Sequence, residues 1–190
     1  MFSKRQLQII ETSIEIIANR GIQGFTIKNL SKAIGISEPA IYRHFENKTE
    51  ILVAILNTFK EMGEMMSMMV VNNTDTAIEK IEFMFSKMLE IFAEQPAFIS
   101  VIFSEEIFKN EEVLKDKIVD IMNLHQTNIE NIVELGQKDK NIRPDVDKTS
   151  MALIFMGALR LLVKRWELNN QNFDLKQEGK RLINAFKLMV

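Results

Sequence analysis

Apolar residues recur every three or four positions along almost the whole chain, and no stretch alternates apolar and polar residues with a period of two. The first spacing lines one face of an α-helix, whereas a half-buried β-strand needs the second. Only three prolines and seven glycines interrupt the 190 residues, so long helices can persist. The pattern therefore predicts an all-α fold of about nine helices.

Capping residues and helix breakers give the expected boundaries. Gly21, Gly24 and Gly35 end helices, and Pro96 restarts one. The segment 72–75, Asn-Asn-Thr-Asp, is a break that we expect to supply the next N-cap. The expected helices cover roughly residues 3–20, 27–34, 38–45, 48–69, 76–94, 97–109, 112–138, 146–169 and 174–189.

Two of these helices are short and are joined by Gly35-Ile36-Ser37. Thr26 can cap the first helix and Ser37 the second, while Gly35 supplies the left-handed backbone of the turn. Together with the helix before them they have the layout of a helix-turn-helix, whose second helix enters the DNA major groove. The outward face of that second helix carries small and polar side chains, as a groove-reading surface requires.

The net charge of −2 is unevenly distributed. Seven lysines and arginines stand against four glutamates up to Lys48, so this segment carries +3 and the remainder −5. A basic N-terminal segment on an acidic body suits a protein of which only that segment approaches phosphate.

Residues 25–48 resemble the DNA-binding domain of the tetracycline-repressor (TetR) family. The shared motifs, in order, are Thr-Ile-x-x-Leu from Thr26, Ala-x-Gly-Ile-Ser from Ala33, Ile-Tyr-x-His-Phe from Ile41, and then Lys48. The match extends over about residues 5–56, roughly a quarter of the chain. Downstream, only the number and layout of the helices resemble the family.

The resemblance implies that Tyr42, His44 and Lys48 contact DNA phosphates and that Thr26 both caps its helix and binds a phosphate. Base reading would fall to Lys28, Ser37, Glu38, Pro39 and Ala40. Glu38 departs from the neutral or basic residue expected opposite a polyanion, although a carboxylate can accept a hydrogen bond from cytosine N4. The expected DNA contacts are Thr26, Lys28, Ser37, Glu38, Pro39, Ala40, Tyr42, Arg43, His44 and Lys48.

A single helix-turn-helix reads few bases, so we expect a homodimer on a palindromic operator of double-stranded DNA. The last two helices are rich in apolar residues and would form an isologous four-helix interface. The expected interface residues are Phe155, Ala158, Leu162, Leu182 and Phe186.

The central helices are rich in phenylalanine and methionine, which predicts a cavity for a small apolar or amphipathic effector. In the TetR family such a ligand shifts the fourth helix and changes the spacing of the two DNA-binding heads. A filled core without a cavity is the alternative. The residues expected to line the pocket are Met62, Met66, Phe85, Met88, Phe92, Phe103, His125 and Phe155.

Enzyme chemistry finds no support, because the chain has no cysteine, only two distant histidines and no glycine-rich phosphate loop. We therefore expect no catalytic residue, no metal and no cofactor. No apolar run is long enough for a membrane span or a signal core, so we expect a cytoplasmic protein.

We expect a helix-turn-helix domain over residues 1–48 and an effector-binding and dimerisation domain over 49–190. The favoured function is a bacterial repressor that its effector releases from DNA. Two alternatives stay open: a DNA-binding adaptor of the same family that a protein partner regulates, and a helical interaction scaffold that does not bind DNA.

Overall fold

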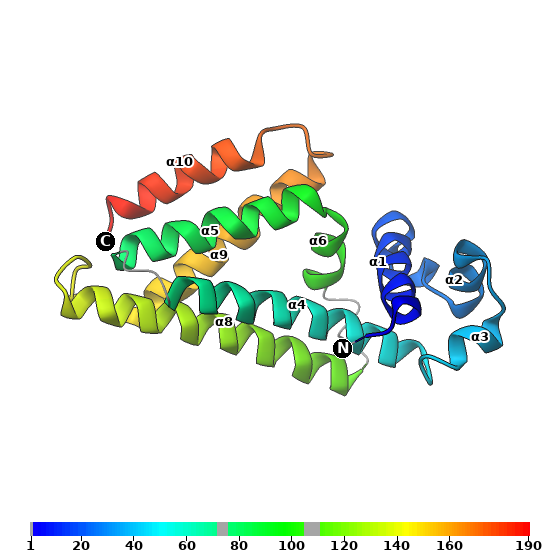
Figure 1. The fold of residues 1–190 in the computed structure, drawn as a ribbon. Coiled ribbons are helices and arrows are strands. Elements are labelled where there is room, and N and C mark those ends of the chain that lie inside the picture. Colours follow the sequence, from blue (N-terminus) through cyan, green and yellow to red (C-terminus); the bar gives the residue numbers. More distant parts are fainter. Residues whose placement is uncertain (1, 72–75, 105–110) are drawn as a thin grey trace. The chain divides into compact units, whose positions relative to one another are not determined.

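The computed structural model describes residues 2–71, 76–104 and 111–190 (Figure 1). Within these ranges the secondary structure consists of nine helices and no strand, which confirms the predicted all-α fold. None of these helices combines the length and the apolar character that crossing a lipid bilayer requires. The helices are α1 (Lys4–Gly24), α2 (Ile27–Ile34), α3 (Glu38–Tyr42), α4 (Lys48–Val71), α5 (Ala77–Glu94), α6 (Ala97–Ile102), α8 (Glu112–Lys138), α9 (Lys148–Leu168) and α10 (Leu175–Lys187).

Backbone contacts divide the chain into two compact units. The first contains residues 1–61 and 96–120, and the second contains residues 62–95 and 121–190. The first unit thus includes α6 as well as the helices of the predicted helix-turn-helix. The functional boundary that we expect after residue 48 stays a prediction.

In the first unit, α1 packs against both α2 and α6. A capping box starts α1, because the Gln6 N–H donates to the Ser3 hydroxyl while the Ser3 N–H donates to the Gln6 side chain. The buried face of α1 is mostly isoleucine, and burying each such side chain contributes about 1.5–3 kcal/mol. Gly21, with a φ of 66°, interrupts the helix one residue after the predicted end at Arg20.

In the second unit, α10 packs against α5 and α9 (Figure 1). Their shared centre holds three aromatic rings, one from each helix. The Phe155 ring centroid lies 5.1 Å from that of Phe85 and 5.6 Å from that of Phe186, both edge to face. Such ring pairs contribute about 0.5–1.5 kcal/mol each beyond the area they bury.

Two helix starts and one connection in this unit show how local hydrogen bonds set the chain path. Thr76 caps α5 in a capping box with Glu79, one residue after the segment 72–75 in which we expected the cap; that segment lies outside the described residues. Between α9 and α10, the Trp166 indole N–H donates to the Phe173 carbonyl over 2.9 Å. This bond ties the end of α9 to the residue before Asp174, which caps α10.

Gly136 in α8 marks a close approach of that helix to its neighbours. A β-carbon at position 136 would lie 2.6 Å from the Ala77 Cβ in α5 and 2.7 Å from the Ile142 Cδ1. Because the Ala77 Cβ is fixed to the backbone, the helices would have to separate to admit a side chain.

We expect Gly136→Ala to destabilise the protein by about 1–3 kcal/mol, since the overpacking strain exceeds the helix-propensity gain of about 1 kcal/mol. Urea unfolding followed by circular dichroism measures the difference. Asn131→Ala, at an exposed position of the same helix, is the control and should be neutral or slightly stabilising. Equal stability of Gly136→Ala and the control would show that α5 and α8 are not in close contact.

Candidate nucleic-acid interface

The start of α2 is fixed by two side chains in the first unit. The Thr26 hydroxyl accepts a hydrogen bond from the Asn29 N–H over 3.1 Å, which confirms the predicted cap. The Asn29 side chain in turn donates to the Gly24 carbonyl over 2.8 Å, joining α2 to the end of α1. Local hydrogen bonds therefore fix how α2 is oriented relative to the end of α1.

The turn between α2 and α3 depends on Gly35. Its φ of 78° is in the left-handed region, as predicted, and its N–H and that of Ile36 both donate to the Ser31 carbonyl. A β-carbon at Gly35 would meet no other atom within 4 Å, so the requirement for glycine is conformational rather than steric.

The recognition helix α3 covers five residues and ends earlier than the predicted helix, with Arg43 and His44 in the turn that follows. Ile41 and Phe45 are buried and hold this segment on the core. On α2, Ala33 is exposed and Ile34 only half-buried. The reason is that an eight-residue helix presents one narrow stripe to the core, and Leu30 and Ser31 occupy it.

All ten residues expected to contact DNA lie in the first unit, on α2, on α3 and its flanking turns, or at the start of α4, and none of them is buried. Tyr42 is half exposed despite its size, which is consistent with a side chain that contacts a partner outside the chain. Ser37 occupies the N-cap position of α3, yet its hydroxyl makes no capping hydrogen bond. The predicted side-chain cap at Ser37 is therefore absent.

Lys48, the first residue of α4, is held in place from two sides. Its ammonium lies 5.2 Å from the centroid of the Phe25 ring and 3.5 Å from the Ile22 carbonyl oxygen. Partial burial lowers the pKa of Lys48. A cation is unfavourable at a helix N-terminus, so an anionic partner outside the chain would stabilise this arrangement.

Two positioning residues were missed by the sequence analysis. The Gln6 side chain, besides completing the cap of α1, donates to the His44 carbonyl over 3.4 Å and so connects α1 to the end of the recognition segment. The Asn47 side chain accepts from the Glu50 N–H over 2.8 Å and fixes the start of α4 beside Lys48. The Ser-x-x-Gln and Asn-x-x-Glu spacings at these positions are the capping-box signal that could have identified both.

Seven of the eight residues expected to line an effector pocket lie in the second unit, and Phe103 lies in the first. Met66, Phe85, Phe92 and Phe155 are buried, while the other three in that unit are half-buried. The imidazole of His125 lies against Gly63 of α4, where a β-carbon would approach its Cε1 to 2.4 Å, and burial lowers the pKa of His125. One turn further on, the Asn128 side chain donates to the Ser67 hydroxyl over 2.6 Å.

The residues expected at a dimer interface face inward to a large extent. Phe155, Leu162 and Phe186 are buried in the core of their own unit, and Ala158 and Leu182 are half-buried. The apolar side chains that α9 turns outward include Leu153, Ile154 and Leu161, with exposed fractions of 55%, 55% and 64%. Because α9 is apolar on both sides, its hydrophobic pattern did not show which side faces the core.

Comparison with known proteins agrees with this arrangement. Residues 9–55 match the family model for bacterial regulatory proteins of the tetR family, and residues 77–190 match that for the C-terminal region of MAATS-type transcriptional repressors. The fatty acid metabolism regulator protein of Bacillus subtilis is 26% identical over 174 residues, which cover 90% of this chain and 88% of that protein.

Two solved structures have the same fold. The transcriptional regulator FadR from Bacillus subtilis, solved with stearoyl-CoA, superposes with a TM-score of 0.82 at 23% identity, covering 94% of this chain and 95% of the other. AibR, solved with isovaleryl coenzyme A and operator DNA, gives a TM-score of 0.80 at 20% identity, covering 96% and 97%. The two family matches together span most of the chain. They show that this chain belongs to the tetR family of bacterial regulatory proteins and that its C-terminal region is that of a MAATS-type transcriptional repressor.

Proposed function

We propose that this transcriptional regulator is a homodimeric repressor, that it binds a palindromic operator through the exposed residues of α2, α3 and the start of α4, and that an acyl-coenzyme A releases it. The main support is the helix-turn-helix, in which every expected DNA-contacting side chain is unburied while Ile41 and Phe45 carry the packing. Such a regulator acts where its operator lies, so we also propose a cytoplasmic location.

The proposed effector class rests on the relatives and on the composition of the second unit. FadR was solved with a long-chain acyl-CoA and AibR with a short branched one, so acyl chains of different lengths bind proteins of this fold. Methionines such as Met62, Met66 and Met88 adapt their shape readily and suit a binding region that must admit a flexible chain. Burial would hold the acyl group, at about 25 cal/mol per Å² of apolar surface.

The proposed dimer uses the outward face of α9. Leu153, Ile154 and Leu161 recur at helical spacing on this face, and Gly157 lies among them with nothing within 4 Å of an added β-carbon. A symmetry-related α9 could approach closely at this glycine and cover the three apolar side chains.

We expect Lys48→Ala and His44→Ala to weaken binding to all duplex sequences by similar factors and to reduce the salt dependence by about one counterion each. Lys28→Ala should instead change the preference among operator variants by about 1–3 kcal/mol. Fluorescence anisotropy at several salt concentrations measures both effects, with Lys115→Ala, on the exposed surface of α8, as the control. If Lys48→Ala and His44→Ala keep the wild-type affinity and salt slope, the assignment of phosphate contacts is wrong.

Acyl-CoA binding should raise the melting temperature and release the operator, with a coupling of about 1–3 kcal/mol between the two sites. We expect the response to depend on chain length when short, medium and long acyl-CoAs are compared with free coenzyme A. Met88→Trp should abolish the response and preserve DNA binding, whereas Met122→Trp, at an exposed methionine of α8, should preserve both. A protein that binds its operator but responds to no acyl-CoA would support the adaptor alternative.

Leu161→Glu should convert dimers to monomers in sedimentation and lower operator affinity, because an unpaired carboxylate buried in an apolar interface costs roughly several kcal/mol. Since Leu161 is exposed in the protomer, the variant should remain folded by circular dichroism. Leu188→Glu, at a position that is 90% exposed, is the matched control and should stay dimeric. Dimers that persist in Leu161→Glu would place the interface elsewhere.

A further inference from the structure

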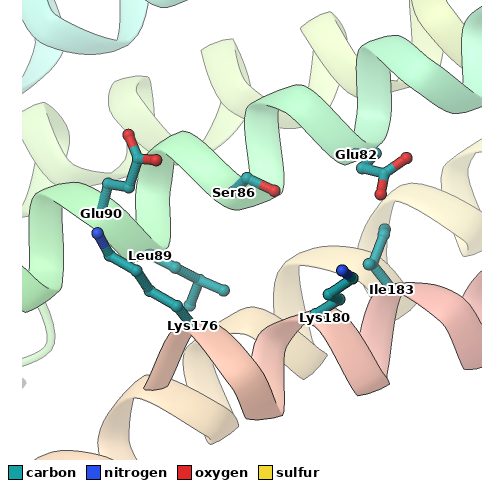
Figure 2. A pocket seen from close by; sticks show the side chains of 7 residues that line it. All are labelled: Glu82, Ser86, Leu89, Glu90, Lys176, Lys180 and Ile183. Atoms are coloured by element: carbon teal, nitrogen blue, oxygen red, sulfur yellow. The ribbon is translucent and has the colours of Figure 1, made fainter. Parts of the chain in front are cut away.

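A hollow of about 310 Å³ lies between α5 and α10 in the second unit (Figure 2). Its volume is at the lower end of the range for small-molecule sites, about 300–1,000 Å³. Neither the DNA interface nor the proposed dimer face uses it. The lining residues are Glu82, Ser86, Leu89, Glu90, Lys176, Lys180 and Ile183.

The buried part of the hollow is apolar. Leu89 and Ile183 are only 2% and 3% exposed, so they form a floor rather than a rim. Gly179 allows this close packing, because a β-carbon there would lie 1.9 Å from the Leu89 Cδ1. Ser86 is exposed on the α5 side and presents a hydroxyl above this floor (Figure 2).

The two carboxylates of the lining already have lysine partners that do not line the hollow. Glu90 pairs with Lys87 over 2.6 Å, and Glu82 pairs with Lys187. Each of these carboxylates therefore has an ion-pair partner outside the hollow.

The two lysines of the lining add positive charge beyond the lysines that pair with Glu82 and Glu90. Lys176 and Lys180 are one turn apart on α10, and Figure 2 shows both side chains on the side of the helix that faces α5. Lys176 is close enough to Glu90 to help lower the pKa of that carboxyl. Among the residues that the structure describes, Lys180 has no salt-bridge partner. This surplus stands out because residues 49–190 carry a net charge of −5.

We propose that the hollow binds an amphipathic anion, a phosphate or carboxylate attached to an apolar chain. Lys176, Lys180 and the Ser86 hydroxyl hold the anionic group, and the chain lies on Leu89 and Ile183. This site is separate from the proposed function: it requires neither operator binding nor a response to acyl-coenzyme A.

Decyl phosphate, kept below its micelle concentration, is the probe, and the full-length protein without DNA is titrated by calorimetry. Trp166 is the only tryptophan of the chain, and its hydrogen bond to Phe173 next to the start of α10 makes its fluorescence a second readout. Decyl phosphate should bind at least about tenfold more tightly than decanol or inorganic phosphate, because only the amphipathic anion uses both floor and lysines. Equal binding of decanol or of inorganic phosphate would overturn the proposal.

The double variant Lys176→Gln with Lys180→Gln should weaken decyl phosphate binding by roughly tenfold. Lys115→Gln with Lys117→Gln makes the same change of net charge on α8 and should leave the binding unchanged. Equal losses in the two double variants would mean that net charge alone attracts the probe, which would overturn the proposed site.

Two single variants test the hollow without removing its lysines. Ser86→Phe, at an exposed position, should fill the space and abolish binding, and Glu90→Gln should tighten binding because it removes a competing carboxylate. If Ser86→Phe is folded by circular dichroism and still binds decyl phosphate, the probe lies elsewhere.

Phosphatidylglycerol vesicles should not bind the protein. Binding to vesicles but not to monomeric decyl phosphate would assign the lysines to a membrane surface and overturn the proposal.

Discussion

The burial of Ile41 and Phe45 is the interaction on which the candidate DNA interface depends. An isolated helix of five residues is not stable in water, because the cost of starting a helix is recovered only over several turns. α3 persists because these two side chains are packed into the core of the first unit. Since two inward residues carry the packing, the remaining residues of the segment can be chosen for what they contact outside the chain. Gly35 and Thr26 then set the direction in which that outward face points.

The parts of the fold that could be predicted from the sequence are those that short-range interactions determine. The cap at Thr26, the left-handed Gly35 and the inward positions of Ile41 and Phe45 each follow from residues within one or two turns. The TetR resemblance came from this same segment, and the family model for the N-terminal region matches residues 9–55. The local interactions and the family match therefore point to the same helix-turn-helix segment.

What could not be predicted depends on long-range packing. α9 is apolar on both sides, so its pattern could not show that Phe155 and Leu162 face inward while Leu161 faces outward. The division of the chain that groups α6 with α1 follows from contacts between residues more than seventy positions apart, which no local spacing rule can predict. The contact between the Lys48 cation and the Phe25 ring is also non-local, because it joins the residue after α1 to the first residue of α4.

The second unit also has a mechanical property that follows from its glycines. α8 contacts α4 at His125 and Gly63, and eleven residues later it contacts α5 at Gly136 and Ala77. These two points are separated by about 16 Å along the helix axis. Sliding α8 by one turn, about 5.4 Å, would bring a side chain to the place of Gly136 beside Ala77 and would move His125 away from Gly63. Translation of α8 along its axis would therefore disrupt its contacts with both α4 and α5, so these two points together fix the register of α8 within the unit.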